Sequence, residues 1–175
     1  MLAYVLARGG HGMKTLYVLR HGQAVPEGEA ESDHERKLTA RGRIEARLAA
    51  EYLSRRPRLP ALILCSSATR AAMTAEVCLT ALPAQTQLTI VSSLYLAEPA
   101  SCLAALAAGG DPHDCVLVVG HNPGLEALIY VLTERSEHLA TASLVELDLS
   151  IALWRELSGE PAVRGRVVDH FRARA

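Results

Sequence analysis

The sequence has almost no lysine, no closely spaced cysteines and no hydrophobic run long enough to cross a membrane. Only Lys14 and Lys37 are lysines, so arginine supplies nearly all of the 18 positive charges, and 19 acidic residues bring the net charge to −1. Nucleic acids and anionic membranes select for an excess of basic residues, so this balance argues against both as main partners. No apolar stretch reaches the ~18 residues of a transmembrane helix.

The four cysteines, at positions 65, 78, 102 and 115, form no CxxC pair. Three of them lie in apolar runs, a pattern typical of buried free thiols in a reducing compartment, so we expect a cytoplasmic protein. Residues 1–12 include Arg8 and three glycines and do not resemble a secretory signal. We interpret them as a disordered tail, or an upstream start, before a single domain over residues 13–175.

Half of the residues are hydrophobic and 21% are charged, which excludes a disordered or collagen-like chain. Apolar runs that are typical of buried strands alternate along the chain with segments of helical pattern. The expected strands cover residues 16–19, 61–65, 88–91 and 116–119. The expected helices cover residues 39–55, 69–82 and 98–108. A fourth helix is expected with Pro123 at its first position. This alternation predicts an α/β fold, a three-layer α-β-α sandwich around a mostly parallel mixed sheet.

Two further predictions concern local detail. In the helix over residues 39–55, Thr39 is the expected N-cap, and the expected buried stripe consists of Ile44, Leu48, Ala49, Tyr52 and Leu53. Residues 143–149 alternate between apolar and polar, and residues 163–168 are expected to pair with them as an antiparallel closing hairpin.

Charged and imidazole side chains follow three of the expected strands directly. Arg20-His21-Gly22 follows the first strand, Ser66-Ser67 and then Arg70 follow the second, and Gly120-His121-Asn122 follows the fourth. Ligands of open α/β sheets bind at the carboxyl ends of the strands, so these side chains converge if the strands are neighbours. No acid stands directly at the three turns. Arginines, imidazoles and helix N-termini together predict an anion site, with a phosphoryl group as the expected ligand.

Each residue also has a plain structural interpretation. A histidine after a strand is more often a solvated loop residue than a catalyst, and Arg70 could be an ordinary first-turn helix residue. A metallohydrolase built on His21, His121 and either Asp114 or His113 is a rival interpretation, but the sequence has no tight metal-ligand spacing. A phosphate-binding module without turnover and a small-molecule phosphomonoesterase also stay open.

Four segments resemble the histidine phosphatase superfamily, whose fold is the phosphoglycerate-mutase-like sandwich. They are Arg20-His21-Gly22-Gln23-Ala24, Leu38-Thr39-Ala40-Arg41-Gly42, the segment from Ser66 to Ala75, and Val119-Gly120-His121-Asn122-Pro123. Ser67 replaces a proline of the family pattern and Met73 replaces a glutamine. The segment from Ser32 to Thr39 and the short connection after Ala75 are similar to the small bacterial phosphohistidine phosphatases, the SixA-like branch.

This resemblance implies a metal-independent phosphatase without cofactors, in which His21 is the nucleophile and carries a transient phosphoryl group. The phosphate-binding residues that it implies are Arg20, Gly22, Arg36, Arg70, His121 and Asn122, with Asn122 also capping the helix beside the phosphate. Glu98 is the implied general acid, although an acid before Pro99 is also what the helix dipole favours. The implied partner is a phosphorylated protein that carries phosphohistidine, or a phosphorylated small molecule, and the implied oligomeric state is a monomer.

Overall fold

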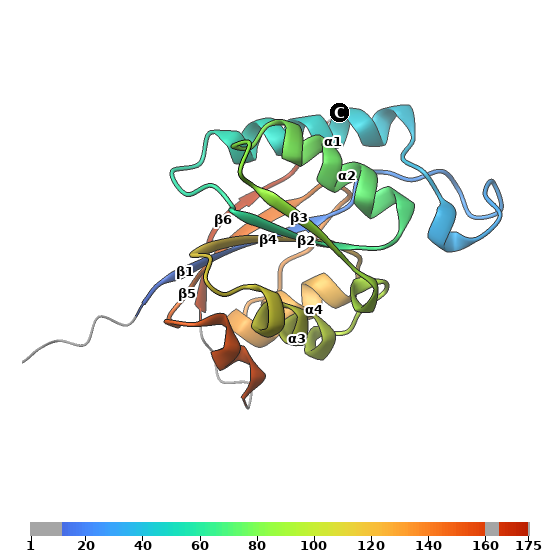
Figure 1. Ribbon diagram of the computed structural model, residues 1–175. Coiled ribbons are helices and arrows are strands. Elements are labelled where there is room, and N and C mark those ends of the chain that lie inside the picture. Colours follow the sequence, from blue (N-terminus) through green and yellow to red (C-terminus); the bar gives the residue numbers. More distant parts are fainter. Residues whose placement is uncertain (1–11, 160–164, 175) are drawn as a thin grey trace, which may run out of the picture.

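The computed structural model describes residues 12–159 and 165–174, so the predicted tail lies outside the described residues except for Gly12. A single sheet in the order β3-β2-β4-β1-β5-β6 lies between two layers of helices (Figure 1). The strands are β1 (Lys14–Arg20), β2 (Leu62–Ser66), β3 (Gln87–Val91), β4 (Cys115–Gly120), β5 (Leu144–Leu149) and β6 (Gly165–Phe171). The first four are parallel, β5 runs antiparallel to β1, and β6 runs antiparallel to β5, which confirms the mostly parallel mixed sheet.

Helices cover both faces of this sheet. They are α1 (Ala40–Ser54), α2 (Thr69–Thr80), α3 (Pro99–Gly109) and α4 (Gly124–Thr133), with short 3-10 turns η1 (Asp33–Glu35), η2 (Ser92–Leu94) and η3 (Trp154–Ser158). In Figure 1, α1 and α2 lie on one face and α3 and α4 lie on the other, which completes the predicted three layers. None of the helices in the described part of the chain is long and apolar enough to cross a membrane.

Helix α1 begins as predicted, and of its predicted buried stripe only Ile44 is exposed. The hydroxyl of Thr39 accepts a hydrogen bond from the amide of Gly42 at 2.9 Å, which satisfies a free donor of the first turn. Ile44 is 49% exposed, so its assignment to the buried stripe was wrong. The buried face of α1 is made mostly of small residues (Gly42, Ala46, Ala49 and Ala50, with Leu53 at its end). It packs against α2, whose buried positions Ala71, Ala75 and Cys78 are also small, so the two helices can approach closely.

The predicted closing pair of strands is confirmed, with one difference in burial. The polar members of the alternation in β5 do not face solvent, because both faces of the sheet are covered. Instead Glu146 pairs with Arg56 at 2.6 Å and Asp148 pairs with Arg166 at 2.8 Å. The start of the second predicted strand, at residues 163 and 164, lies outside the described residues.

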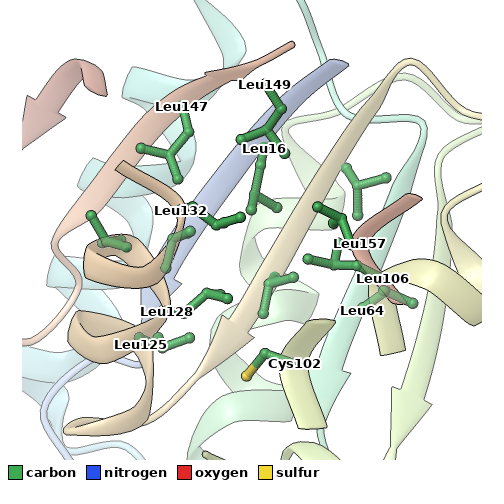
Figure 2. Close-up of a cluster of buried hydrophobic side chains, with 14 of the residues drawn as sticks. Leu16, Leu64, Cys102, Leu106, Leu125, Leu128, Leu132, Leu147, Leu149 and Leu157 are labelled. Atoms are coloured by element: carbon green, nitrogen blue, oxygen red, sulfur yellow. The ribbon is translucent and has the colours of Figure 1, made fainter. Parts of the chain in front are cut away.

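Two apolar cores, one on each face, fix β1, β2 and β4 in place. Figure 2 shows part of the larger core, where leucines of the strands pack against leucines of α3 and α4. The four cysteines are free and buried, as their apolar neighbours predicted. Because the strands are held rigidly from both faces, the residues that follow their carboxyl ends have well-defined positions.

Candidate active site

The sheet order brings the predicted site residues to one edge. Strand β4 lies between β2 and β1, with Arg20 opposite Gly120 in the register. The residues that follow these two are therefore also neighbours, and the amide of His21 donates to the carbonyl of Gly120 at 3.2 Å. The ring centroids of His21 and His121 are 5.0 Å apart.

His21 is a buried imidazole whose two nitrogens have different partners. Nδ1 lies 2.7 Å from the carbonyl oxygen of Gly22, which can only accept, so Nδ1 carries the proton and Nε2 holds a lone pair. The Nε of Arg70 donates toward this Nε2 at 3.2 Å. Burial, and then the charges of the nearby arginines, lower the pKa of His21 to about 4. The ring is therefore neutral at pH 7, the state that a nucleophile requires.

The turn after His21 is tightly packed. A Cβ on Gly22 would overlap the carbonyl oxygen of Gly42 in the first turn of α1, and a Cβ on Gly42 would overlap the carbonyl of Gln23. The amide of Gly22 donates to the hydroxyl of Thr74 at 3.1 Å. The structure therefore gives a packing reason for glycine at position 22, and the role of Gly22 in phosphate binding stays a prediction.

Arg70 is 3% exposed, and within the described residues its other side-chain hydrogen bonds all go to Asp33. Its Nη1 donates to the main-chain carbonyl of Asp33 at 2.5 Å, and its Nη2 donates to Oδ2 of the same residue at 2.9 Å. Arg36 also reaches Asp33, with Nη1 2.7 Å from Oδ1, while its Nε donates to the carbonyl of Val25 at 2.7 Å. An acid therefore does stand in the site, although it comes from η1 and not from one of the three turns.

Arg20 and Asn122 meet at the carbonyl of Leu139, in the loop before β5. Nη1 of Arg20 lies 2.8 Å from this oxygen, and Nδ2 of Asn122 lies 2.9 Å from it. The Asn122 amide also donates to Glu126 at 2.7 Å, and no side chain caps the N-terminus of α4. The prediction that Asn122 caps this helix was wrong, because its amide holds the loop instead.

His121 is 4% exposed and is tied to the end of β2. Its Nε2 lies 2.8 Å from the hydroxyl oxygen of Ser66, which itself accepts from the amide of Ala68 at 3.3 Å. Among the described residues the Ser66 hydroxyl has no other acceptor, so we assign its proton to Nε2 of His121 and the imidazole proton to Nδ1. Within the described part of the chain this buried Nδ1 has no hydrogen-bond partner. Burial, and then the charges of His21 and Arg70, lower the pKa of His121 to about 3.

Tyr95 and His34 close one side of the site, and sequence reasoning missed both. The Tyr95 hydroxyl donates to Oδ2 of Asp33 at 2.7 Å, and the Tyr95 ring meets His121 edge to face at 5.7 Å. His34 packs edge-on against Tyr95 and lies 2.9 Å from the hydroxyl of Ser67, the residue that replaces a proline of the family pattern. The segment from Ser32 to Thr39 was the only sequence signal for this side of the site.

Glu98, the predicted general acid, is the exposed N-cap residue of α3. It lies at the rim of an apolar hollow of about 520 Å³ between α3, α4 and η3. In the described residues no hydrogen bond or ion pair joins its carboxylate to His21 or to an arginine. The backbone next to it is close to the site, because a Cβ on Gly124 would overlap the carbonyl of Ala97. Its role as an acid stays a prediction.

The residues of the rival metal site lie apart. His121 follows the carboxyl end of β4, whereas Asp114 precedes its amino end and pairs with Lys14 at 2.8 Å. Over residues 12–159 and 165–174, no group of three or more histidine, cysteine, aspartate or glutamate side chains is placed to hold a metal ion. Asp114 and His113 therefore lie at the opposite end of β4 from His21 and His121.

Sequence comparison identifies relatives of this chain. The sequence model of the histidine phosphatase superfamily (branch 1) matches residues 16–94. An uncharacterized protein of Mycobacterium tuberculosis is 40% identical over 121 residues, which are 67% of this chain and 72% of the relative. An uncharacterized protein of Mycobacterium leprae is 33% identical over 120 residues, which are 66% of this chain and 71% of the relative.

Solved structures share the whole architecture. A protein of Nakamurella multipartitia provisionally named phosphohistidine phosphatase SixA superposes with a TM-score of 0.79 and 27% identity, over 94% of this chain and 98% of that one. A similarly named protein of Agrobacterium tumefaciens gives a TM-score of 0.74 and 25% identity, over 90% and 97%. A mycobacterial glucosyl-3-phosphoglycerate phosphatase shares the fold at 20% identity, with a TM-score of 0.63 over 89% and 97%.

Proposed function

Since the chain belongs to the histidine phosphatase superfamily and is similar to its SixA-like members, we propose that it hydrolyses phosphohistidine on a partner protein, with His21 as the nucleophile. Membership of the superfamily supports phosphatase chemistry. One observation carries the assignment to His21. Its neutral imidazole presents the Nε2 lone pair to the guanidinium of Arg70 at 3.2 Å, beside a second neutral histidine. A nucleophile beside a group that binds phosphate is the arrangement that covalent phosphoryl transfer needs.

In the first step, Nε2 of His21 attacks the phosphorus, and the bond between phosphorus and the substrate nitrogen breaks. The electron pair of that bond leaves with the substrate imidazole, which takes up a proton from solvent. Positive charge then develops on the ring of His21. The carbonyl of Gly22, which accepts from Nδ1 at 2.7 Å, stabilises this charge and keeps the ring oriented.

The phosphoryl oxygens need donors on several sides as the transferred group becomes planar. Arg70 offers its Nε edge beside His21. Arg20, at the end of β1, and Arg36, in the loop after η1, add positive charge near it. His121 offers the proton on Nδ1, which no group in the described residues accepts. A buried donor without a partner costs about 1–3 kcal/mol, so a phosphoryl oxygen at this position would restore a lost interaction.

In the second step, water attacks the phosphorus, the bond to Nε2 breaks, and inorganic phosphate leaves. The electron pair returns to Nε2, and the proton lost by the water is carried by phosphate or solvent. The scheme uses arginine charge throughout, so it requires no metal ion or cofactor.

Phosphohistidine is the proposed substrate because its leaving group needs little acid assistance. The one candidate acid that the sequence offered, Glu98, is exposed, and in the described part of the chain its carboxylate makes no hydrogen bond or ion pair with the other site residues. Only the residues from 76 to 86 separate Ala75 from β3, so no lid is inserted there. A site without such an insertion would admit a side chain of a partner protein more readily than it would enclose a free metabolite.

Three substrates assayed in parallel test this proposal: a protein phosphorylated on histidine, a phosphoserine peptide and a sugar phosphate. We expect the phosphohistidine protein to be hydrolysed fastest. We also expect a rapid quench into alkaline detergent, which preserves phosphorus–nitrogen bonds, to trap label on His21. Faster hydrolysis of the sugar phosphate would contradict the proposed substrate but not the proposed role of His21. Phosphate binding without turnover of any substrate would favour a binding module.

A further inference from the structure

Asp33 connects the arginines of the site with Tyr95, and the proposed chemistry gives Asp33 no role. Both of its carboxylate oxygens are engaged. Oδ1 accepts from Arg36, and Oδ2 accepts from both Arg70 and Tyr95, at 2.7–2.9 Å. Hydrogen bonds from Tyr95, Arg36 and Arg70 hold the pKa of Asp33 well below its usual range, so it is ionised at neutral pH.

The contacts of Arg70 divide its guanidinium into two edges. The end edge, formed by Nη1 and Nη2, is filled by the carbonyl and the carboxylate of Asp33. The side edge, formed by Nε and the second proton of Nη2, faces His21, since Nε lies 3.2 Å from its Nε2. A guanidinium has five N–H donors in one plane, so fixing the end edge also fixes the direction of the side edge.

Asp33 is itself held in place. Its neighbour His34 lies 2.9 Å from the Ser67 hydroxyl, and Arg36 is anchored on the Val25 carbonyl. The short turn η1 therefore has contacts on both sides of Asp33. A carboxylate held in this way can restrict the motion of a long arginine side chain, which is costly to order at the moment of reaction.

We propose that Asp33 is a positioning residue for phosphoryl transfer, which binds the end edge of Arg70 and so presents the side edge to the phosphoryl group at His21. This inference rests on the proposed function. The opposite role is a definite alternative. An anion on Arg70 could instead compete with phosphate, in which case removing it would strengthen phosphate binding.

Asp33→Asn separates the two roles. An amide has one acceptor oxygen, so it cannot accept from Arg36 on one side and from Arg70 and Tyr95 on the other. Positioning predicts that kcat for the phosphohistidine protein falls about 10- to 100-fold, while the inhibition constant of inorganic phosphate changes by less than about threefold. Competition predicts tighter inhibition by phosphate and an unchanged or higher kcat/KM, and this result would overturn the proposal.

Glu35→Gln is the matched control. Glu35 lies in the same turn and is exposed, and its carboxylate accepts only from the hydroxyl of Ser32 in the described residues. The substitution removes one negative charge from η1 and no contact with an arginine, so we expect kcat within about twofold of wild type. An equal loss in both variants would assign the effect to loop charge and would contradict positioning by Asp33.

A double-mutant cycle tests whether Asp33 acts through Arg70. In an Arg70→Lys background the forked end edge no longer exists, so adding Asp33→Asn should change kcat by less than about threefold. Full additivity would contradict the inference. Should Asp33→Asn unfold, Asp33→Glu keeps the charge but displaces it, and positioning then predicts a kcat below wild type. Retained turnover in His21→Ala would instead refute the proposed function itself, so the two failures are distinguishable.

Discussion

The two histidine turns of the site differ in which ring atom they leave for a ligand. Both histidines follow parallel strands that lie side by side, and both are buried with a proton on Nδ1. His21 donates that proton to the carbonyl of Gly22, so its Nε2 lone pair is presented. His121 accepts at Nε2 from Ser66, so its Nδ1 proton is presented. Each ring therefore takes its role from one neighbouring oxygen. The Gly22 carbonyl makes His21 an electron-pair donor, and the Ser66 hydroxyl makes His121 a hydrogen-bond donor.

Replacing each histidine by alanine should give the largest difference in turnover between the two turns. His21→Ala removes the attacking atom, so we expect turnover to fall at least about a thousandfold and the trapped label to disappear. His121→Ala removes one hydrogen bond to the phosphoryl group, and we expect a loss of about 10- to 100-fold with label still trapped. Steady-state rates and alkaline-quench labelling measure both. Equal losses, or a His21→Ala variant with more than a few per cent of wild-type activity, would contradict the different roles.

Arg70→Lys tests the arginine that lies on the His21 side. Lysine keeps the charge but lacks the two edges of the guanidinium, so it cannot bind Asp33 and a phosphoryl group at the same time. We expect kcat/KM to fall about 10- to 1,000-fold, which corresponds to ~1.4–4 kcal/mol of transition-state stabilisation.

Arg55→Lys is a suitable control for that measurement, because Arg55 is an exposed residue paired only with Glu51 at 3.7 Å in the described structure. It should leave kcat/KM unchanged. Near-wild-type kinetics in Arg70→Lys would mean that Arg70 does not bind the transferred group.

Acid should destabilise the protein through these histidines. The pKa of His21 is about 4 when folded, against a usual value of about 6.5. Below pH 6.5 the unfolded chain takes up a proton that the folded chain does not, so stability is fully present above pH 6.5 and is lost as the pH falls toward 4. The expected loss from His21 is about 3 kcal/mol, at ~1.4 kcal/mol for each unit of pKa. Urea unfolding at several pH values between 7 and 4 measures it.

His21→Gln provides the comparison for the acid measurement. Glutamine does not titrate, so the free energy of unfolding of this variant should fall less steeply between pH 6.5 and 4 than that of wild type. Parallel slopes for the two proteins would show that His21 is not a source of the acid sensitivity.

The sequence predicted the residues that follow strands, but of the loop residues it predicted only Arg36 and missed Asp33. Arg20, His21, Arg70 and His121 lie together because adjacent parallel strands end at the same edge, and the strands were recognisable as apolar runs. Asp33 reaches the site from a polar loop, whose path depends on contacts with Tyr95 and Ser67 that no local pattern encodes.

The error at Ile44 has a different physical cause. Helical periodicity identifies the apolar residues that could be buried, but the size of the residues on the facing helix decides which stripe packs. Because α2 presents Ala71 and Ala75, α1 turns its own alanines inward and leaves Ile44 partly exposed.

Ser66→Ala tests whether the Ser66 hydroxyl fixes the position of the proton on His121. Without the hydroxyl, Nε2 of His121 loses its donor, and the proton can move from Nδ1 to Nε2, which would turn Nδ1 into an acceptor facing the phosphoryl group. We expect kcat/KM to fall about tenfold, in line with the loss of one buried hydrogen bond of ~1–1.5 kcal/mol.

Ser67→Ala is its matched control, since the Ser67 hydroxyl contacts His34 and not His121. The same kinetic assay should show a smaller loss for this variant. If Ser67→Ala were as damaging as Ser66→Ala, the fixed proton position on His121 would not explain the effect.

Of these site variants, Glu98→Gln should have the smallest effect on hydrolysis of the phosphohistidine protein, and its effect should depend on the substrate. Glu98 precedes α3, on the side of the site that His121 occupies, and its carboxylate is exposed. An alkoxide leaving group must be protonated as it departs, whereas an imidazole leaves with little help. If Glu98 is the acid, kcat for a phosphoserine peptide or a sugar phosphate should fall about tenfold or more, and kcat for the phosphohistidine protein should stay within about threefold. Measured side by side, equal losses on all substrates would assign Glu98 to binding or stability. No loss on any substrate would remove it from the chemistry and leave the departing group to be protonated by water.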